Sequence, residues 1–192
     1  MKRAGWREEV AGVAAEDLVF VDESGANVRM TRAYARAPRH QRAVGRVPRN
    51  HGKATSLVAA LTPCGLAAPL RRLSAFDAGS FAAYVEQTLG PALRPGQVVV
   101  LDNLSIHKDA RVRAAVEATG CRLVFLPPYS PDCSPIEFAF AKVKAALRKA
   151  GARAQGALDA AAPQGVCDRA VATITAQDAR GFFRHCGYPL AQ

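Results

Sequence analysis

The sequence predicts a mixed α/β domain with a central sheet flanked by helices, and three observations support this class. Short apolar runs such as LVFV, VVVL and RLVF have the length and composition of buried strands. Helical patterns follow the later strands, and this order places helices against a sheet. A chain of 192 residues, 49% of them hydrophobic, is long enough for one domain with a substantial core.

Local patterns indicate the individual elements. Apolar runs bounded by Gly, Pro or Asn indicate strands, and apolar residues at a spacing of 3.6 indicate helices. Asp77 is expected to cap a helix and Gly120 to close another. The expected order is strands at 18–24, 27–36 and 56–63, an extended piece at 66–73, a helix at 77–89, a strand at 98–103, a helix at 108–119, a strand at 122–127, a helix of about 15 residues after a proline-rich loop, and interrupted helix within 155–186.

Three acidic residues lie at the ends of these elements. Asp22 ends the first strand, Asp102 follows the VVVL run, and Glu137 lies in the first turn of the helix in LPPYSPDCSPIEFAFAK. Ligands collect at the carboxyl ends of strands in open α/β sheets, so Asp22 and Asp102 would lie side by side if their strands are neighbours. Four of the 12 prolines fall between Pro127 and Pro135, and they restrict the backbone just before Glu137.

This pattern of acids indicates a metal site. Three clustered carboxylates would repel one another and resist ionisation unless a cation lay between them. Mg²⁺ takes oxygen ligands and uses only a few protein carboxylates. Two such ions, about 3.5–4 Å apart, can activate an attacking oxygen and stabilise the leaving oxygen at a phosphodiester. Asp22, Asp102 and Glu137 are therefore candidate ligands of two Mg²⁺ ions, with Mn²⁺ as a substitute.

Each of these residues also has a structural interpretation. Ser134 and Glu137 fit a capping box, and the two aspartates could be polar strand ends. Glu23 follows Asp22 but points to the opposite face of a strand, so only one of the pair is expected in the site. His107, five residues after Asp102, is an auxiliary candidate for contacting a phosphate or the attacking water, or a histidine with local hydrogen bonds only.

The charge of the chain predicts a polyanionic partner, most simply nucleic acid. The chain has 26 Lys and Arg residues against 16 Asp and Glu residues, a net charge of +10. No acid lies between Glu23 and Asp77, and Lys144 and Arg148 share the side of Glu137 on its helix. Phosphate contacts are favoured over a merely solvated face for this basic interval. Its basic residues are Arg29, Arg32, Arg36, Arg39, Arg42, Arg46, Arg49, Lys53, Arg71 and Arg72.

Other features narrow the class of protein. The five cysteines form no CxxC pair, which favours reduced thiols in a cytoplasmic protein. Glu8 and Glu9 stand where a secretory signal needs apolar residues, and the most apolar region is too short and interrupted to span a membrane. Trp6 and Tyr34 could stack on bases, although ordinary packing is the commoner role of such residues.

Three stretches taken together resemble a known family. VDESG, LDNLSIHK and LPPYSPDCSPIEFAFAK, in that order, resemble the IS630 transposases of the Tc1/mariner superfamily, with 34 residues between Asp102 and Glu137. The resemblance implies an RNase H-like fold with a five-stranded mixed sheet and Asp22, Asp102 and Glu137 as catalytic metal ligands. It also implies DNA strand cleavage and strand transfer at transposon ends, in which water attacks first and a freed 3′-hydroxyl attacks next.

The resemblance also sets expectations for domains and partners. Residues 1–17 would be a linker remnant and residues 18–192 the catalytic domain, without the helix-turn-helix domains of full-length relatives. DNA would be the substrate, and the chain would form a homodimer or associate with a separate helix-turn-helix subunit. The alternatives are a catalytically inactive, regulatory DNA-binding remnant and a metal-dependent nuclease of the RNase H type.

Overall fold

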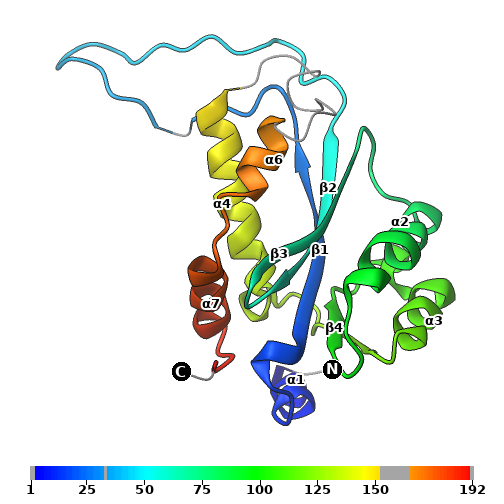
Figure 1. The fold of residues 1–192 in the computed structure, drawn as a ribbon. Coiled ribbons are helices and arrows are strands. Elements are labelled where there is room, and N and C mark those ends of the chain that lie inside the picture. Colours follow the sequence, from blue (N-terminus) through cyan, green and yellow to red (C-terminus); the bar gives the residue numbers. More distant parts are fainter. Residues whose placement is uncertain (1–2, 33, 152–164, 191–192) are drawn as a thin grey trace.

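The centre of the molecule is a five-stranded mixed sheet (Figure 1). The computed structural model describes residues 3–32, 34–151 and 165–190. The strands are β1 (Leu18–Ala26), β2 (Thr55–Thr62), β3 (Gly65–Arg72), β4 (Val98–Leu101) and β5 (Arg122–Phe125). Their order is β3-β2-β1-β4-β5, with β1, β4 and β5 parallel and with β2 antiparallel to both β1 and β3. The predicted fold class is therefore confirmed.

Helices cover both faces of the sheet, with α4, α6 and α7 on one side and α2 and α3 on the other (Figure 1). A turn of π-helix (Val85–Leu89) and a short 3₁₀ turn (Gly90–Ala92) extend α2. The helices are α1 (Arg3–Val10), α2 (Ala78–Tyr84), α3 (Ala110–Ala118), α4 (Pro135–Ala150), α6 (Val166–Val171) and α7 (Ala176–His185).

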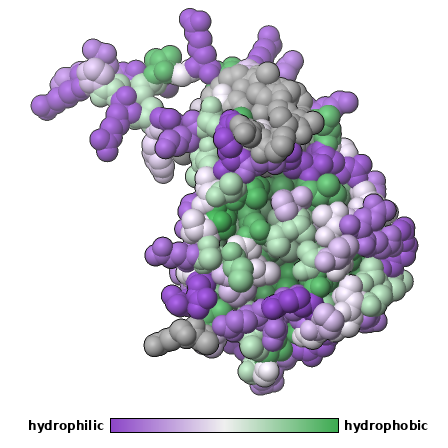
Figure 2. Space-filling view, in the orientation of Figure 1, coloured by the Kyte–Doolittle hydropathy of each residue, from purple (hydrophilic) through white to green (hydrophobic). Residues whose placement is uncertain are grey.

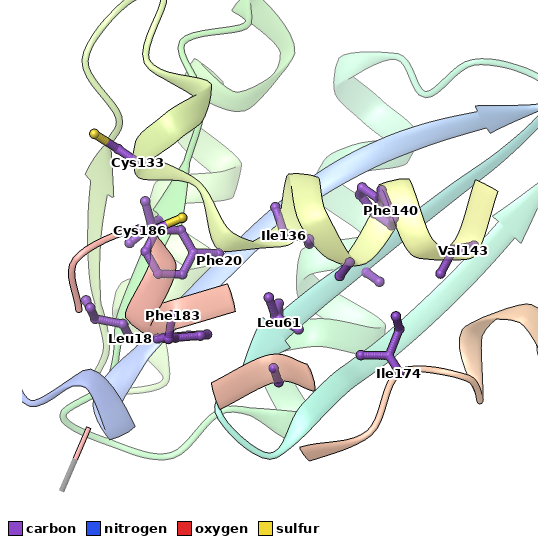
Figure 3. Close-up of a cluster of buried hydrophobic side chains, with 14 of the residues drawn as sticks. Leu18, Phe20, Leu61, Cys133, Ile136, Phe140, Val143, Ile174, Phe183 and Cys186 are labelled. Atoms are coloured by element: carbon purple, nitrogen blue, oxygen red, sulfur yellow. The ribbon is translucent and has the colours of Figure 1, made fainter. Parts of the chain in front are cut away.

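The alternation of side chains along β1 divides the core into two clusters. Leu18 and Phe20 face α4 and α7, whereas Val19 and Val21 face α2 and α3. The cluster of Leu18 and Phe20 also holds the four apolar residues that recur at helical spacing in the sequence of α4, Ile136, Phe140, Val143 and Leu147. Figure 3 shows this cluster from Phe20 to Val143. Phe20 therefore shares the face of Asp22, as the period of a strand requires.

The prediction of a strand at residues 27–36 is wrong, because residues 27–32 and 34–36 form no strand. The backbone turns instead at Asn27, whose side chain accepts a hydrogen bond from the Arg29 amide at 3.0 Å. The position beside β1 is filled by β2, and Ala26 pairs directly with Thr55. The extended piece at 66–73 is the third strand of this half of the sheet, β3.

The termini of several elements follow their local sequence. Asp77 caps α2 and forms a reciprocal capping box with Ser80. Gly120 has a φ of 75°, and this conformation suits the turn that closes α3. In the region expected to hold interrupted helix, α6 and α7 are present, and residues 155–164 lie outside the described part of the chain.

The N-terminal helix α1 packs against the sheet. Trp6 is 1% exposed and belongs to the same core cluster as Phe20. Its indole nitrogen donates a hydrogen bond to the hydroxyl of Tyr188, 3.1 Å away, near the other end of the chain. Trp6 thus has a packing role and is not available to stack on a base. None of the helices in the described ranges is long and apolar enough to cross a membrane.

Candidate active site

Asp22 and Asp102 are brought together by the pairing of β1 with β4. These strands are parallel, and Leu18 pairs with Val98 and Phe20 with Val100. The same register carried two residues further places Asp22 beside Asp102, just beyond the end of β4. The two strands are therefore neighbours, which was the condition set by the sequence.

Glu137 reaches the same region from the first turn of α4. Pro135 occupies the first helical position, and the N-cap residue Ser134 makes no side-chain capping hydrogen bond. The capping box, which was the alternative interpretation of Ser134 and Glu137, is therefore not formed. The carboxylate of Glu137 is exposed and lines one pocket of about 430 Å³ together with Asp22 and Asp102.

The loop before Glu137 is held from two directions. The side-chain amide of Asn103 donates a hydrogen bond to the carbonyl of Leu126, which ties the end of β5 to the loop after β4. The buried hydroxyl of Tyr188 donates to the carbonyl of Cys133 at 2.6 Å, directly before the start of α4. The prolines therefore act with two long-range hydrogen bonds in positioning this loop.

Asp22 has a raised pKa in this pocket. Burial, together with the negative charges of Glu137, Glu23 and Asp102, raises the pKa of Asp22 to about 7, although the hydrogen bond from the Glu23 amide lowers it in part. A divalent cation would remove this repulsion, and carboxylate oxygens are the donors that Mg²⁺ prefers. In the described part of the chain, however, no three His, Cys, Asp or Glu side chains already stand close enough to hold a metal ion. The donor type fits, but the carboxylates would have to move inward to share an ion.

Asp102 is held from behind by His107, which is fully buried. The Nδ1 of His107 lies 2.6 Å from Oδ1 of Asp102, and its Nε2 lies 3.1 Å from Oε2 of Glu23. Burial lowers the pKa of His107, but the hydrogen bonds to Asp102 and Glu23 and their charges outweigh it and raise this pKa to about 9. The imidazolium form, with both N–H groups donating, therefore suits this position at neutral pH.

His107, which bridges Glu23 and Asp102, helps to shift the pKa of Asp102 in the direction opposite to that of Asp22. Burial raises the pKa of Asp102, but hydrogen bonds from His107 and the Leu104 amide, with the charges of His107 and Lys108, lower it overall. Asp102 is thus ionised more readily than its neighbour. The structure places His107 behind Asp102 and not on the pocket wall.

Glu23 takes part in the site indirectly, which the sequence did not indicate. Asp22 faces the pocket, and Glu23 points to the other face of the sheet, as the alternation predicts. Glu23 nevertheless reaches Asp102 through His107. Two adjacent acids at a strand end and a histidine in a later loop were visible in the sequence, but only the fold shows that they meet.

The basic arm, residues 29–53, leaves the sheet after β1 and returns to β2. It runs outward from the body in Figure 1, and its surface is predominantly hydrophilic in Figure 2. None of its eight predicted DNA-contacting residues forms an ion pair with another described residue. All eight are exposed: Arg29, Arg32, Arg36, Arg39, Arg42, Arg46, Arg49 and Lys53.

The remaining basic residues lie in different surroundings. Lys144 and Arg148 are partly buried on α4. Arg71 forms an ion pair with Asp168 at 3.1 Å, and Arg72 lies over the ring of Phe76. Arg71 and Arg72 therefore contact other side chains of the folded body and are not part of the arm.

The strand order and the acidic pocket between β1, β4 and α4 define an RNase H-like fold of the kind found in DDE proteins. The chain belongs to the DDE superfamily endonuclease family, whose sequence profile matches residues 17–159. A comparison with curated protein sequences found no match.

Solved structures with the same fold are distant in sequence. The Mos1 mariner paired end complex with Mn matches with a TM-score of 0.66 and 14% identity over 95% of this chain and 56% of that one. The Mos1 strand transfer complex matches with a TM-score of 0.59 and 15% identity over 98% and 60%. A simian T-cell lymphotropic virus intasome matches with a TM-score of 0.55 and 13% identity over 84% and 49%. The chain thus spans less than two thirds of each of these proteins.

Proposed function

We propose that this chain is the catalytic domain of an IS630-group DDE transposase that cuts DNA and joins the cut strand to target DNA. The observation that carries the proposal is the meeting of Asp22, Asp102 and Glu137 in one pocket, within the region matched by the DDE family. Structures of similar fold are described as a Mos1 complex with Mn and as a Mos1 strand transfer complex, which supports divalent metal use and DNA as the substrate.

Each carboxylate has a distinct part in this proposal. Asp22 resists ionisation until a positive charge enters the pocket, so it couples metal binding to loss of its proton. Asp102 is held ionised and oriented by His107. Glu137 stands in the first turn of α4, where the helix dipole favours negative charge. Bound Mg²⁺ or Mn²⁺ would activate the attacking oxygen and stabilise the leaving oxygen of a phosphodiester.

DNA would lie between the pocket and the basic arm. The arm begins a few residues beyond Asp22, so its arginines extend from the site along a possible backbone track. Arginine can contact phosphate oxygens bidentately. Lys144 and Arg148 would contribute further charge from α4. Because such contacts release counterions, binding should weaken steeply as salt rises.

We further propose that a partner subunit takes part in the recognition of transposon ends. The chain spans 56% and 60% of the Mos1 proteins of similar fold. A homodimer, or a separate helix-turn-helix subunit, would supply the specific contacts to the ends. We place the protein in the cytoplasm, where the cysteines would stay reduced.

The test is cleavage and joining of labelled DNA carrying the ends of the element, with Mg²⁺ or Mn²⁺. Asp22→Asn, Asp102→Asn and Glu137→Gln should each lower the cleavage rate by about a thousandfold, because several kcal/mol of metal stabilisation disappears. Glu86→Gln, which changes an exposed acid paired with Arg111, should have no effect.

Three other outcomes would point elsewhere. Equal cleavage by the parent and all three variants would refute the assignment of the acids. A parent that binds DNA but neither cuts nor joins it would be a regulatory DNA-binding remnant. Cutting without joining would identify a nuclease of the RNase H type.

A further inference from the structure

Tyr129 is an exposed aromatic residue on the wall of the carboxylate pocket, and the proposed chemistry gives it no role. Its side chain is 97% exposed, and it lines the same pocket as Asp22, Asp102 and Glu137. Leu104, 51% exposed, lines this pocket too. An apolar surface therefore stands next to the three proposed metal ligands, where the phosphate of a nucleotide would lie.

Leu104 and Tyr129 lie in the loops that follow two neighbouring strands. Leu104 follows β4, and its amide donates to Oδ1 of Asp102 at 2.9 Å. Tyr129 follows β5, the parallel neighbour of β4, so the two loops emerge at the same edge of the sheet. The position of this apolar surface is thus coupled directly to the position of a proposed metal ligand.

The loop that carries Tyr129 is stiff. Pro127 and Pro128 precede the tyrosine and Pro131 follows it, and each proline fixes its own φ. Ser130 is buried, and its hydroxyl donates to the carbonyl of Pro128 at 3.2 Å. Tyr129 itself has a φ of 54°, which is unusual for a bulky residue. A loop with a restricted backbone loses little conformational entropy when it binds a partner.

We propose that Tyr129, together with Leu104, stacks on an unpaired nucleobase next to the phosphodiester that enters the carboxylate pocket. Every base has an aromatic face, so such stacking does not require a particular sequence. A nucleobase is a better occupant than a second copy of this chain, because the basic arm that follows β1 attracts DNA to this region. This inference rests on the proposed function, since it assumes that DNA enters the pocket.

The experiment uses a duplex with a single-stranded 3′ overhang that carries 2-aminopurine at each overhang position in turn. Ca²⁺ replaces Mg²⁺ so that binding can be observed without cutting. The parent chain should change the fluorescence at one position next to the pocket, and Tyr129→Ala should abolish that change. Tyr129→Ala should also bind the overhang DNA about 5- to 150-fold more weakly, while its affinity for blunt duplex stays unchanged.

Two variants control for other effects. Tyr129→Phe keeps the ring and should behave as the parent does. Leu73→Ala removes an exposed apolar side chain that does not line the pocket, 49% exposed, and should leave the 2-aminopurine signal intact. Since Tyr129 is on the surface, its replacement is not expected to unfold the chain, and circular dichroism checks this.

The outcomes separate this inference from the proposed function. If the parent cuts DNA with Mg²⁺ but Tyr129→Ala leaves the 2-aminopurine signal unchanged, the base contact is refuted and the function stands. If Tyr129→Ala abolishes the signal and the parent never cuts, the base contact stands and the function fails. Self-association that disappears in Tyr129→Ala, with an unchanged signal, would refute the base contact and assign this surface to a second copy.

Discussion

The carboxylate pocket and the basic arm are built in opposite ways. The pocket gathers Asp22, Asp102 and Glu137 from two strands and a helix, and buried groups such as His107 hold it from behind. The arm distributes its positive charges along an exposed segment that has neither helix nor strand in its described residues. The pocket therefore depends on many long-range interactions, whereas the arm depends on few.

This difference follows from what each region is proposed to do. Chemistry at a phosphodiester requires oxygen donors fixed within a few tenths of an ångström, which only a packed scaffold provides. Attraction of a polyanion requires charge in the right region, and a flexible side chain on an exposed loop is sufficient. Single substitutions should accordingly have large effects near the pocket and small, cumulative effects on the arm.

The largest effect outside the carboxylates is expected at His107. His107→Asn removes the bridge from Glu23 to Asp102, and loss of such a supporting hydrogen bond typically lowers metal affinity or activity by about 10- to 100-fold. DNA binding should be unchanged, because His107 is buried. The measurements are the cleavage rate as a function of Mn²⁺ concentration and, separately, DNA affinity. Full activity at limiting Mn²⁺ would show that the bridge does not support Asp102 in catalysis.

The next effect should come from two arm residues changed together. Replacing Arg36 and Arg39 by alanine should make the dependence of log K on log salt concentration shallower by about 0.9 for each phosphate that the arm no longer neutralises. Arg111 and Arg113 on α3 are the matched control, since they pair with Glu86 and Glu117 and carry the same charge. Equal slopes for the arm variant and the control variant would exclude the arm as the DNA track.

A smaller effect, on stability, is expected at Asp22. Its pKa is 3.8 in the unfolded chain and about 7 in the folded one, so the folded state loses stability as pH rises through this range and stays destabilised above it. In the presence of a chelator, Asp22→Asn should therefore raise the melting temperature most above pH 7, and progressively less towards pH 4. Added Mg²⁺ should stabilise the parent more than this variant. A pH-independent difference would contradict the burial and repulsion assigned to Asp22.

The smallest effect is expected at Tyr188, which ties the loop before Glu137 to α1. Tyr188→Phe keeps the ring but removes the hydrogen bonds that its hydroxyl forms with the Trp6 indole N–H and the Cys133 carbonyl. The expected loss is about 1–3 kcal/mol, or about 2–4 °C in melting temperature for each kcal/mol. Tyr34→Phe on the arm is the control and should not change the melting temperature. An unaltered melting temperature for Tyr188→Phe would mean that these hydrogen bonds contribute nothing net.

Much of the fold could be predicted because it depends on local patterns. Apolar runs predicted β1, β2, β4 and β5, and the spacing of Ile136, Phe140, Val143 and Leu147 predicted the buried side of α4. The error at residues 27–36 has a physical cause. A segment forms a strand only where a partner strand is available, and the partner of β1 at this edge is β2.

The sequence by itself determined the chemistry that is available: three acids at element ends, a stiff loop before one of them, and an arm rich in arginine. Tertiary structure alone decided that β1 lies beside β4, that His107 joins Glu23 to Asp102, and that Tyr188 connects Trp6 to the loop before α4. The reason is that the side-chain periods of strands and helices depend on residues close together in the chain, so a sequence shows them directly. Interactions between residues far apart in the chain exist only after the strands have paired in their final order.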